Sequence, residues 1–136
     1  MKKHLLVLAI ASTCFAMNAA SAAEGMTKDQ YNVAKEKIEA DYKVAKAKCD
    51  TLKDNAKDVC EKEAKGTENV AKAQLEQDYK PSAAHAKKVA EEKADMTYDV
   101  AKEKCDDQSG DAKNACVSQA KACLLYTSPS PRDQRG

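Results

Sequence analysis

The sequence predicts an all-α fold of elongated antiparallel helices that share an alanine-rich seam and are held together by disulfides. Apolar residues recur at helical spacing along an otherwise charged chain, and the alternation typical of strands is absent. A segment with two cysteines occurs twice, 56 residues apart. Large hydrophobic residues are scarce, which disfavours one compact core and favours helices that need covalent cross-links.

The N-terminal residues 1–22 have the features of a secretory signal peptide. Lys2 and Lys3 form its charged start, residues 5–17 its apolar stretch, and residues 20–22 a cleavage site of small residues. The apolar stretch is too short to span a bilayer, and no second one follows it. We expect cleavage near Ala22, a periplasmic or secreted location, and no integral membrane segment after cleavage.

Residues 23–81 form the first predicted helical repeat. Thr27 and Gln30 have the spacing of a capping box at its start, and Pro81 marks its end. Similar residues recur every eleven positions, which corresponds to about 3.67 residues per turn of helix. The predicted seam consists of Tyr31, Ala34, Ile38, Tyr42, Ala45, Cys49, Leu52, Ala56, Cys60, Ala64, Ala71, Leu75 and Tyr79.

Residues 82–122 form the second predicted repeat, with Ser82 as a candidate N-cap. Residues 33–65 and 89–121 share 16 identities in 33 aligned positions, which indicates duplication of a structural unit. The second seam consists of Ala90, Ala94, Tyr98, Ala101, Cys105, Ala112, Cys116 and Ala120. We expect this repeat to be truncated, with the natural protein continuing past Ala122.

The last residues, 123–136, differ from the repeats in composition and periodicity. Reverse-translated, residues 123–133 resemble a translated sequencing adapter, because the codons are similar to one frame of a transposase mosaic end. We expect this tail to be non-native.

The charge of the two repeats excludes several classes of partner. Between Ala23 and Ala122 the chain has 19 Lys, no Arg and 21 Asp plus Glu, so its net charge is 19 − 21 = −2. A balanced charge attracts neither nucleic acid nor a membrane surface, and phosphate recognition favours arginine. We expect no nucleic-acid partner.

Four cysteines remain once Cys14 is assigned to the signal peptide and Cys123 to the tail. These are Cys49, Cys60, Cys105 and Cys116. An even number in an oxidising compartment predicts two disulfides.

Helix geometry leaves two disulfide arrangements open. Eleven residues of straight helix rise about 16 Å, whereas the Cα atoms of bonded cysteines lie within about 7 Å. In the first arrangement each pair closes its own hairpin, with turns at residues 54–55 and 110–111. Gly110 favours this arrangement, because glycine commonly follows the end of a helix.

In the second arrangement one long helix ends near Pro81 and a second returns beside it. Cys60 would then bond Cys105, and Cys49 would bond Cys116. This crosswise pairing resembles the twin-cysteine coiled-helix proteins, which also have a spaced cysteine pair on each of two helices. The seam fits both arrangements.

The residues do not predict catalysis, a cofactor or a metal site. Structural zinc sites place ligands two to four residues apart, and the four cysteines are spaced more widely. A Cys-x-x-Cys redox motif is absent, and His85 is expected at a solvated helix start. We expect a protein that is not an enzyme and has no cofactor.

One motif resembles a known group of proteins. Tyr-x-Val-Ala-Lys-x-Lys-Cys-Asp occurs at residues 42–50 and 98–106, and Ala-Lys-x-x-Cys at residues 56–60 and 112–116. These elements resemble largely uncharacterised exported proteobacterial helical proteins, some of them labelled TolA-like cell-envelope proteins. The resemblance implies a periplasmic scaffold or interaction protein of the cell envelope that binds another envelope protein or itself.

Two alternatives remain. The eleven-residue period and its Ala-Lys-x-Lys pattern are similar to late-embryogenesis-abundant proteins, which implies protection against desiccation or stress. A weaker alternative is a redox-responsive periplasmic protein that uses the widely spaced cysteine pairs.

Overall fold

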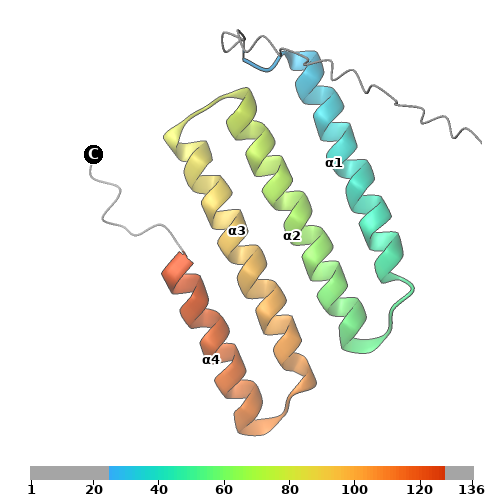
Figure 1. The fold of residues 1–136 in the computed structure, drawn as a ribbon, viewed down its shortest axis with the longest axis vertical. Helices are drawn as coiled ribbons and strands as arrows, with labels where there is room; N and C mark the ends of the chain where they lie inside the picture. The colour runs from blue at the N-terminus through green and yellow to red at the C-terminus, as the bar shows by residue number, and fades with distance from the viewer. Residues whose placement is uncertain (1–24, 128–136) are drawn as a thin grey trace, which may run out of the picture.

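Four antiparallel α-helices lie side by side in the computed structural model, which describes residues 25–127 (Figure 1). The helices are α1 (Lys28–Cys49), α2 (Asp54–Tyr79), α3 (Ala83–Lys104) and α4 (Gly110–Thr127), with a short 3₁₀ helix, η1 (Cys105–Asp107), between α3 and α4. The predicted all-α fold is confirmed, and no strand occurs within the described residues. The predicted signal peptide and residues 128–136 of the tail lie outside them.

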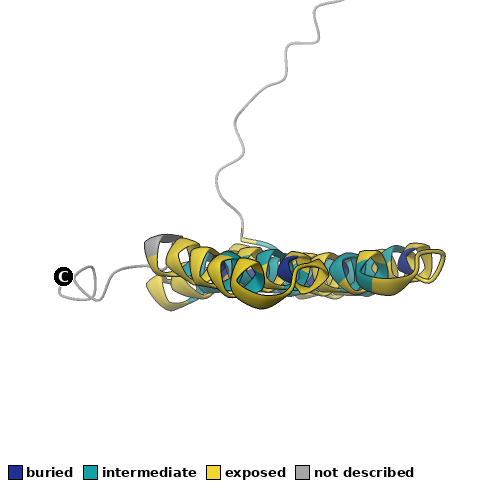
Figure 2. Ribbon diagram, turned by 90° about the horizontal axis from the view of Figure 1, so that it is seen from below, coloured by how far each residue is buried: buried dark blue, intermediate teal, exposed yellow. Residues whose placement is uncertain are grey.

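The helices form a single open layer. Figure 2 shows the layer from below, with the helices in one row and no shared central core. Contacts join α1 to α2, α2 to α3 and α3 to α4. Both broad faces of the inner helices α2 and α3 are therefore left open, and most of the buried residues are small or belong to the disulfides. Those buried are Cys49, Ala64, Glu68, Ala73, Leu75, Val89, Ala94, Cys105 and Ala120.

The predicted seam joins α1 to α2. Thr27 and Gln30 form the predicted capping box, in which each side chain bonds the backbone N–H of the other residue at 3.2 and 2.9 Å. From Tyr31 to Cys49 the seam residues of α1 are buried or half-buried. Leu52 and Ala56 are exposed instead, because Leu52 lies in the turn and Ala56 in the first turn of α2.

The first turn differs from the predicted one by a few residues. It covers residues 50–53, and α2 begins at Asp54 rather than turning there. Asp54 has a φ of 52°, and Gly110, its equivalent in the second repeat, has a φ of 58°. The expectation that Gly110 follows the end of a helix is wrong, because it is the first residue of α4. Both hairpins thus enter their second helix through one left-handed residue, a conformation that glycine and aspartate tolerate best.

The loop at Pro81 joins α2 to α3 as predicted. Lys80 is the C-cap of α2, and the Ser82 hydroxyl accepts a 3.0 Å hydrogen bond from the His85 backbone N–H at the start of α3. Below this loop the two helices approach closely at Gly66. A Cβ atom on Gly66 would lie 2.8 Å from the Cβ of Met96, so the contact requires glycine.

We predict that Gly66→Ala destabilises the fold although alanine favours helix. Overpacking against Met96 costs about 1–3 kcal/mol, whereas alanine gains about 1 kcal/mol over glycine inside a helix. Urea unfolding should therefore give a lower midpoint for G66A than for the unchanged protein.

The matched background is Met96→Ala, which removes the colliding atoms beyond Cβ. In the Met96→Ala background, G66A should lower the free energy of unfolding by less than it does in the unchanged protein, or should raise it. An equal effect of G66A in both backgrounds would contradict a clash between Gly66 and Met96.

Candidate functional site

The two cysteine pairs close the two local hairpins. Cys49 bonds Cys60 with their Cα atoms 5.5 Å apart, and Cys105 bonds Cys116 with a Cα separation of 5.7 Å. The crosswise alternative is therefore not the arrangement found. Both turns lie at the lower end of the layer in Figure 1, opposite the Pro81 loop, so both disulfides fasten the same end.

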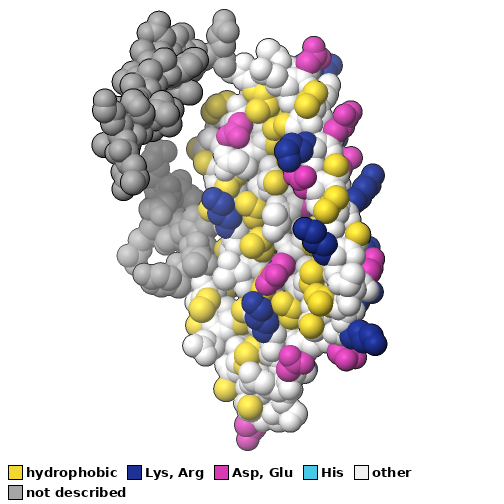
Figure 3. Space-filling model, turned by 45° about the vertical axis from the view of Figure 1, so that its right-hand side comes forward, with side chains coloured by type: hydrophobic (Ala, Val, Ile, Leu, Met, Phe, Trp, Pro, Cys, Tyr) yellow, Lys and Arg dark blue, Asp and Glu magenta, His cyan; other side chains and the backbone are white. Residues whose placement is uncertain are grey.

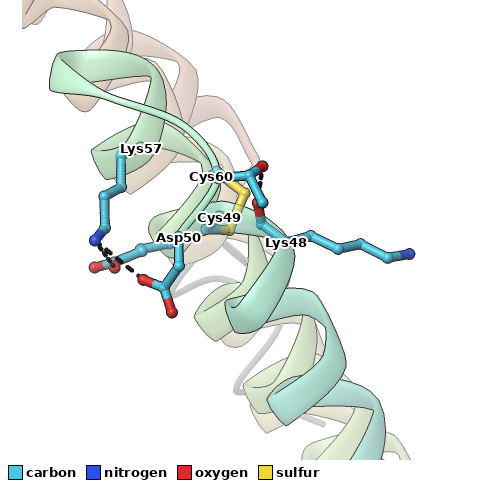
Figure 4. The surroundings of a disulfide bond; sticks show 7 residues. Lys48, Cys49, Asp50, Lys57 and Cys60 are labelled. Atoms are coloured by element: carbon cyan, nitrogen blue, oxygen red, sulfur yellow. Dashed lines mark hydrogen bonds and ion pairs between the residues drawn. A yellow bond between two sulfur atoms is a disulfide. The ribbon is translucent and has the colours of Figure 1, made fainter.

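An ion pair stands beside each disulfide. Lys57 lies 3.0 Å from Asp50 (Figure 4), and the equivalent Lys113 lies 2.8 Å from Asp106. The hydrogen bond to Asp50 raises the pKa of Lys57, and the hydrogen bond from Lys113 lowers the pKa of Asp106. Because these side chains are exposed, the pairs orient the turns more than they stabilise them.

A tyrosine pair closes the opposite end of the first hairpin. The Tyr31 hydroxyl donates a hydrogen bond to Glu76, and the rings of Tyr31 and Tyr79 lie 4.6 Å apart between centroids. The hydrogen bond to the Glu76 carboxylate raises the pKa of Tyr31. In the second repeat, Lys87 stands at the position equivalent to Tyr31. The second hairpin therefore has no tyrosine at this position to make the same ring contact.

Glu68 is a buried carboxylate in the middle of α2. Burial raises its pKa, but hydrogen bonds from Lys65 at 2.8 Å and Lys72 at 2.7 Å outweigh burial, so the pKa is lowered overall. The Lys65 ammonium also lies 5.3 Å from the ring centroid of Tyr42 on α1. Sequence reasoning missed Glu68 because a charged residue gives no apolar signal. Its only hint was its place in the seam, between Ala64 and Ala71.

One broad face of the layer carries two grooves. A groove of about 510 Å³ lies between α1 and α2, and one of about 470 Å³ lies between α2 and α3. Glu63 and Thr67 line both grooves, so the two open on the same face, which we call the grooved face. The helices α1 and α3 contribute equivalent residues of the two repeats, α1 to the first groove and α3 to the second. The equivalent pairs are Asp41/Thr97, Val44/Val100, Ala45/Ala101 and Lys48/Lys104.

A third hollow, of about 310 Å³, lies between α2 and α3 and involves the other side of α2. Glu76 is one of its residues, and it lies nine residues from Thr67, or half a turn around the helix. His85 also lines this hollow, with its Nδ1 atom 2.7 Å from the carbonyl oxygen of Lys80. His85 therefore links the start of α3 to the loop before it, consistent with its expected place at a helix start.

The four predicted site residues are the disulfide cysteines, and they lie in two pairs at one end of the layer. Within residues 25–127, no group of three or more His, Cys, Asp or Glu side chains is arranged to hold a metal ion. None of the helices described combines the length and apolar character needed to cross a bilayer. No protein-family model, curated protein or solved structure matches this chain.

We predict that removing either disulfide weakens the fold by a similar amount, because both close loops of the same length. Cys49→Ala with Cys60→Ala, or Cys105→Ala with Cys116→Ala, should each lower the free energy of unfolding by about 3 kcal/mol. Denaturant unfolding of the two double variants measures this change.

Peptide mapping under non-reducing conditions supplies the control. It should recover a peptide that links Cys49 to Cys60 and another that links Cys105 to Cys116. A peptide that links Cys60 to Cys105 would contradict the local hairpins.

We predict that Glu68→Gln destabilises the protein by about 1 kcal/mol at neutral pH, because two hydrogen bonds to a buried charge are weakened. A carboxylate with a lowered pKa stabilises the fold above its unfolded pKa and loses this effect as the pH falls through its folded pKa. The difference between the two proteins should therefore shrink from about pH 5 to about pH 3.

Glu36→Gln is the matched control, because Glu36 is exposed on α1. Urea unfolding across this pH range should separate the two variants. If E68Q and E36Q behave alike, the hydrogen bonds from Lys65 and Lys72 to Glu68 do not stabilise the fold.

Proposed function

We propose that this protein is a non-enzymatic periplasmic scaffold or interaction protein of the cell envelope. The observation that supports this proposal is the open layer. Its four helices are cross-linked by two disulfides at one end, and both broad faces stay accessible. Such a layer offers a large, flat and rigid surface for its size, which suits binding by contact.

The two ends of the first hairpin support a rigid surface. Cys49 and Cys60 fix the lower end, and the pair of Tyr31 with Tyr79 holds the upper end. A surface that is already ordered loses less conformational entropy on binding. The disulfide and the tyrosine pair therefore favour recognition of a partner over a role as a flexible linker.

The contacts between helices favour the scaffold over the alternative of a stress protectant. A protein that stays disordered in water has no need of matched side chains between its helices. Here Gly66 of α2 fits against Met96 of α3, a contact that exists only when the two helices pack together.

Burial of one cysteine in each disulfide disfavours the redox alternative. Cys49 and Cys105 are completely buried, whereas Cys60 and Cys116 are half-buried. A thiol that attacks a disulfide needs access to sulfur, so exchange at the sulfurs of Cys49 and Cys105 requires opening of the turn. Reversible switching is favoured by exposed and labile disulfides instead.

We predict that the oxidised protein is strongly helical in dilute buffer and loses helix when reduced, because the large apolar residues are too few to hold the helices without the staples. Far-UV circular dichroism before and after treatment with a thiol reductant measures the change.

The same spectra distinguish the alternative. A protein that is coil in buffer and turns helical only in trifluoroethanol would contradict the scaffold and favour the protectant. Disulfide potentials close to that of the periplasm, measured in thiol buffers, would favour the redox-responsive protein.

A further inference from the structure

We propose that the grooved face binds a second copy of this chain, face to face and antiparallel, around a two-fold axis at the level of Val44. This inference rests on the proposed interaction role and names its partner. The two-fold axis lies in the interface and runs across the helices. It therefore stacks α1 on α1, α2 on α2 and α3 on α3 of the other copy.

The centre of the grooved face is apolar although it is open to solvent. Val44 is 57% exposed, and its repeat equivalent Val100 lines the second groove. The Cys49–Cys60 bond sets Val44 level with the middle of α2, and the 3.4 Å ion pair between Lys104 and Glu63 sets Val100 at nearly the same level. Two valines thus flank the ridge formed by Thr67.

The remaining exposed valine of α1 follows the same line. Val33 is 67% exposed and precedes Val44 by eleven residues, which is three turns of helix, so both valines lie on one side of α1. Leu52, in the turn, is 42% exposed. The two-fold axis at Val44 carries Val33 of each copy toward the turn that contains Leu52 of the other copy.

Charges around this centre are self-complementary. Asp41 and Lys48 lie three residues before and four residues after Val44, and both line its groove. The two-fold axis therefore places Asp41 of each copy near Lys48 of the other. Figure 3 shows hydrophobic side chains along the visible side of the layer, with both signs of charge among them. A surface of mixed sign suits its own copy better than a partner of one charge.

The area of the face is sufficient for a stable dimer. A helix of 22 residues is about 33 Å long, and three helices spaced about 10 Å apart cover about 1,000 Å². Specific interfaces bury about 800 Å² on each partner. Stable domains are built from at least two packed layers, and a second copy supplies the layer that this chain lacks.

The test uses the oxidised protein, exported with its own N-terminal segment and purified from the periplasm of a bacterial host. Sedimentation equilibrium should give twice the mass of one chain. Val44→Glu should weaken the dimer at least tenfold, because the two-fold axis brings two carboxylates together. Val44→Lys should weaken it for the same reason, and an equal mixture of V44E and V44K should restore a dimer.

Lys46→Glu is the matched control, because Lys46 is exposed and lies about 200° around α1 from Val44. It should leave the dimer unchanged. A photo-crosslinking amino acid at position 44 gives a second measurement that does not depend on variants of altered charge. Crosslinking should produce a band of two chains, and the same amino acid at position 46 should not.

Two results would overturn the inference. One is an unchanged protein that stays monomeric up to about 0.1 mM, where even weak complexes form. The other is a dimer that V44E, V44K and their mixture leave equally strong. A monomer that is strongly helical when oxidised would overturn only the dimer, whereas a coil would overturn the scaffold as well.

Discussion

The cross-link at one end of each hairpin is the constraint on which the other contacts depend. Between Ala23 and Ala122 the chain has only two Leu, one Ile and no Phe or Trp. Full burial of a large aliphatic side chain contributes about 1.5–3 kcal/mol, and alanine contributes much less. Two disulfides at about 3 kcal/mol each therefore supply a large part of the 5–15 kcal/mol that stabilises an ordinary domain. They also set the register that brings Tyr31 to Tyr79.

The sequence predicted the helices and the first seam because both depend on one periodicity. An eleven-residue period keeps one side of a nearly straight helix facing its neighbour, so the seam from Tyr31 to Cys49 follows from residue spacing alone. The periodicity could not choose between the two disulfide arrangements, since both bury the same seam. Gly110 pointed to the right one, because it provides the left-handed residue with which α4 begins.

Other features could not be predicted because they belong to the layer rather than to one helix. An inner helix needs two packed sides, whereas a single seam accounts for one. The second side of α2 includes Gly66. From the sequence alone this glycine only lowers helix stability, and its role becomes clear once Met96 of α3 is seen to pack against it. Glu68 was missed for a different reason, since its charge hides a buried position, and both lysines that pair with it lie on the same helix. The left-handed conformation of Asp54 could be inferred from the sequence only through the alignment of Asp54 with Gly110.

The duplication explains why one face of the layer carries a repeated pattern. In an antiparallel row the first and third helices run in the same direction, and the seams of α1 and α3 both face the next helix in the row. Equivalent residues of the two repeats therefore point to the same face, as Val44 and Val100 do on either side of α2. In a closed bundle the same helices would turn these residues toward different sides. A flat layer made from a duplicated hairpin thus doubles any exposed feature along one face, so that a single valine with adjacent charges becomes a surface wide enough to bind a partner.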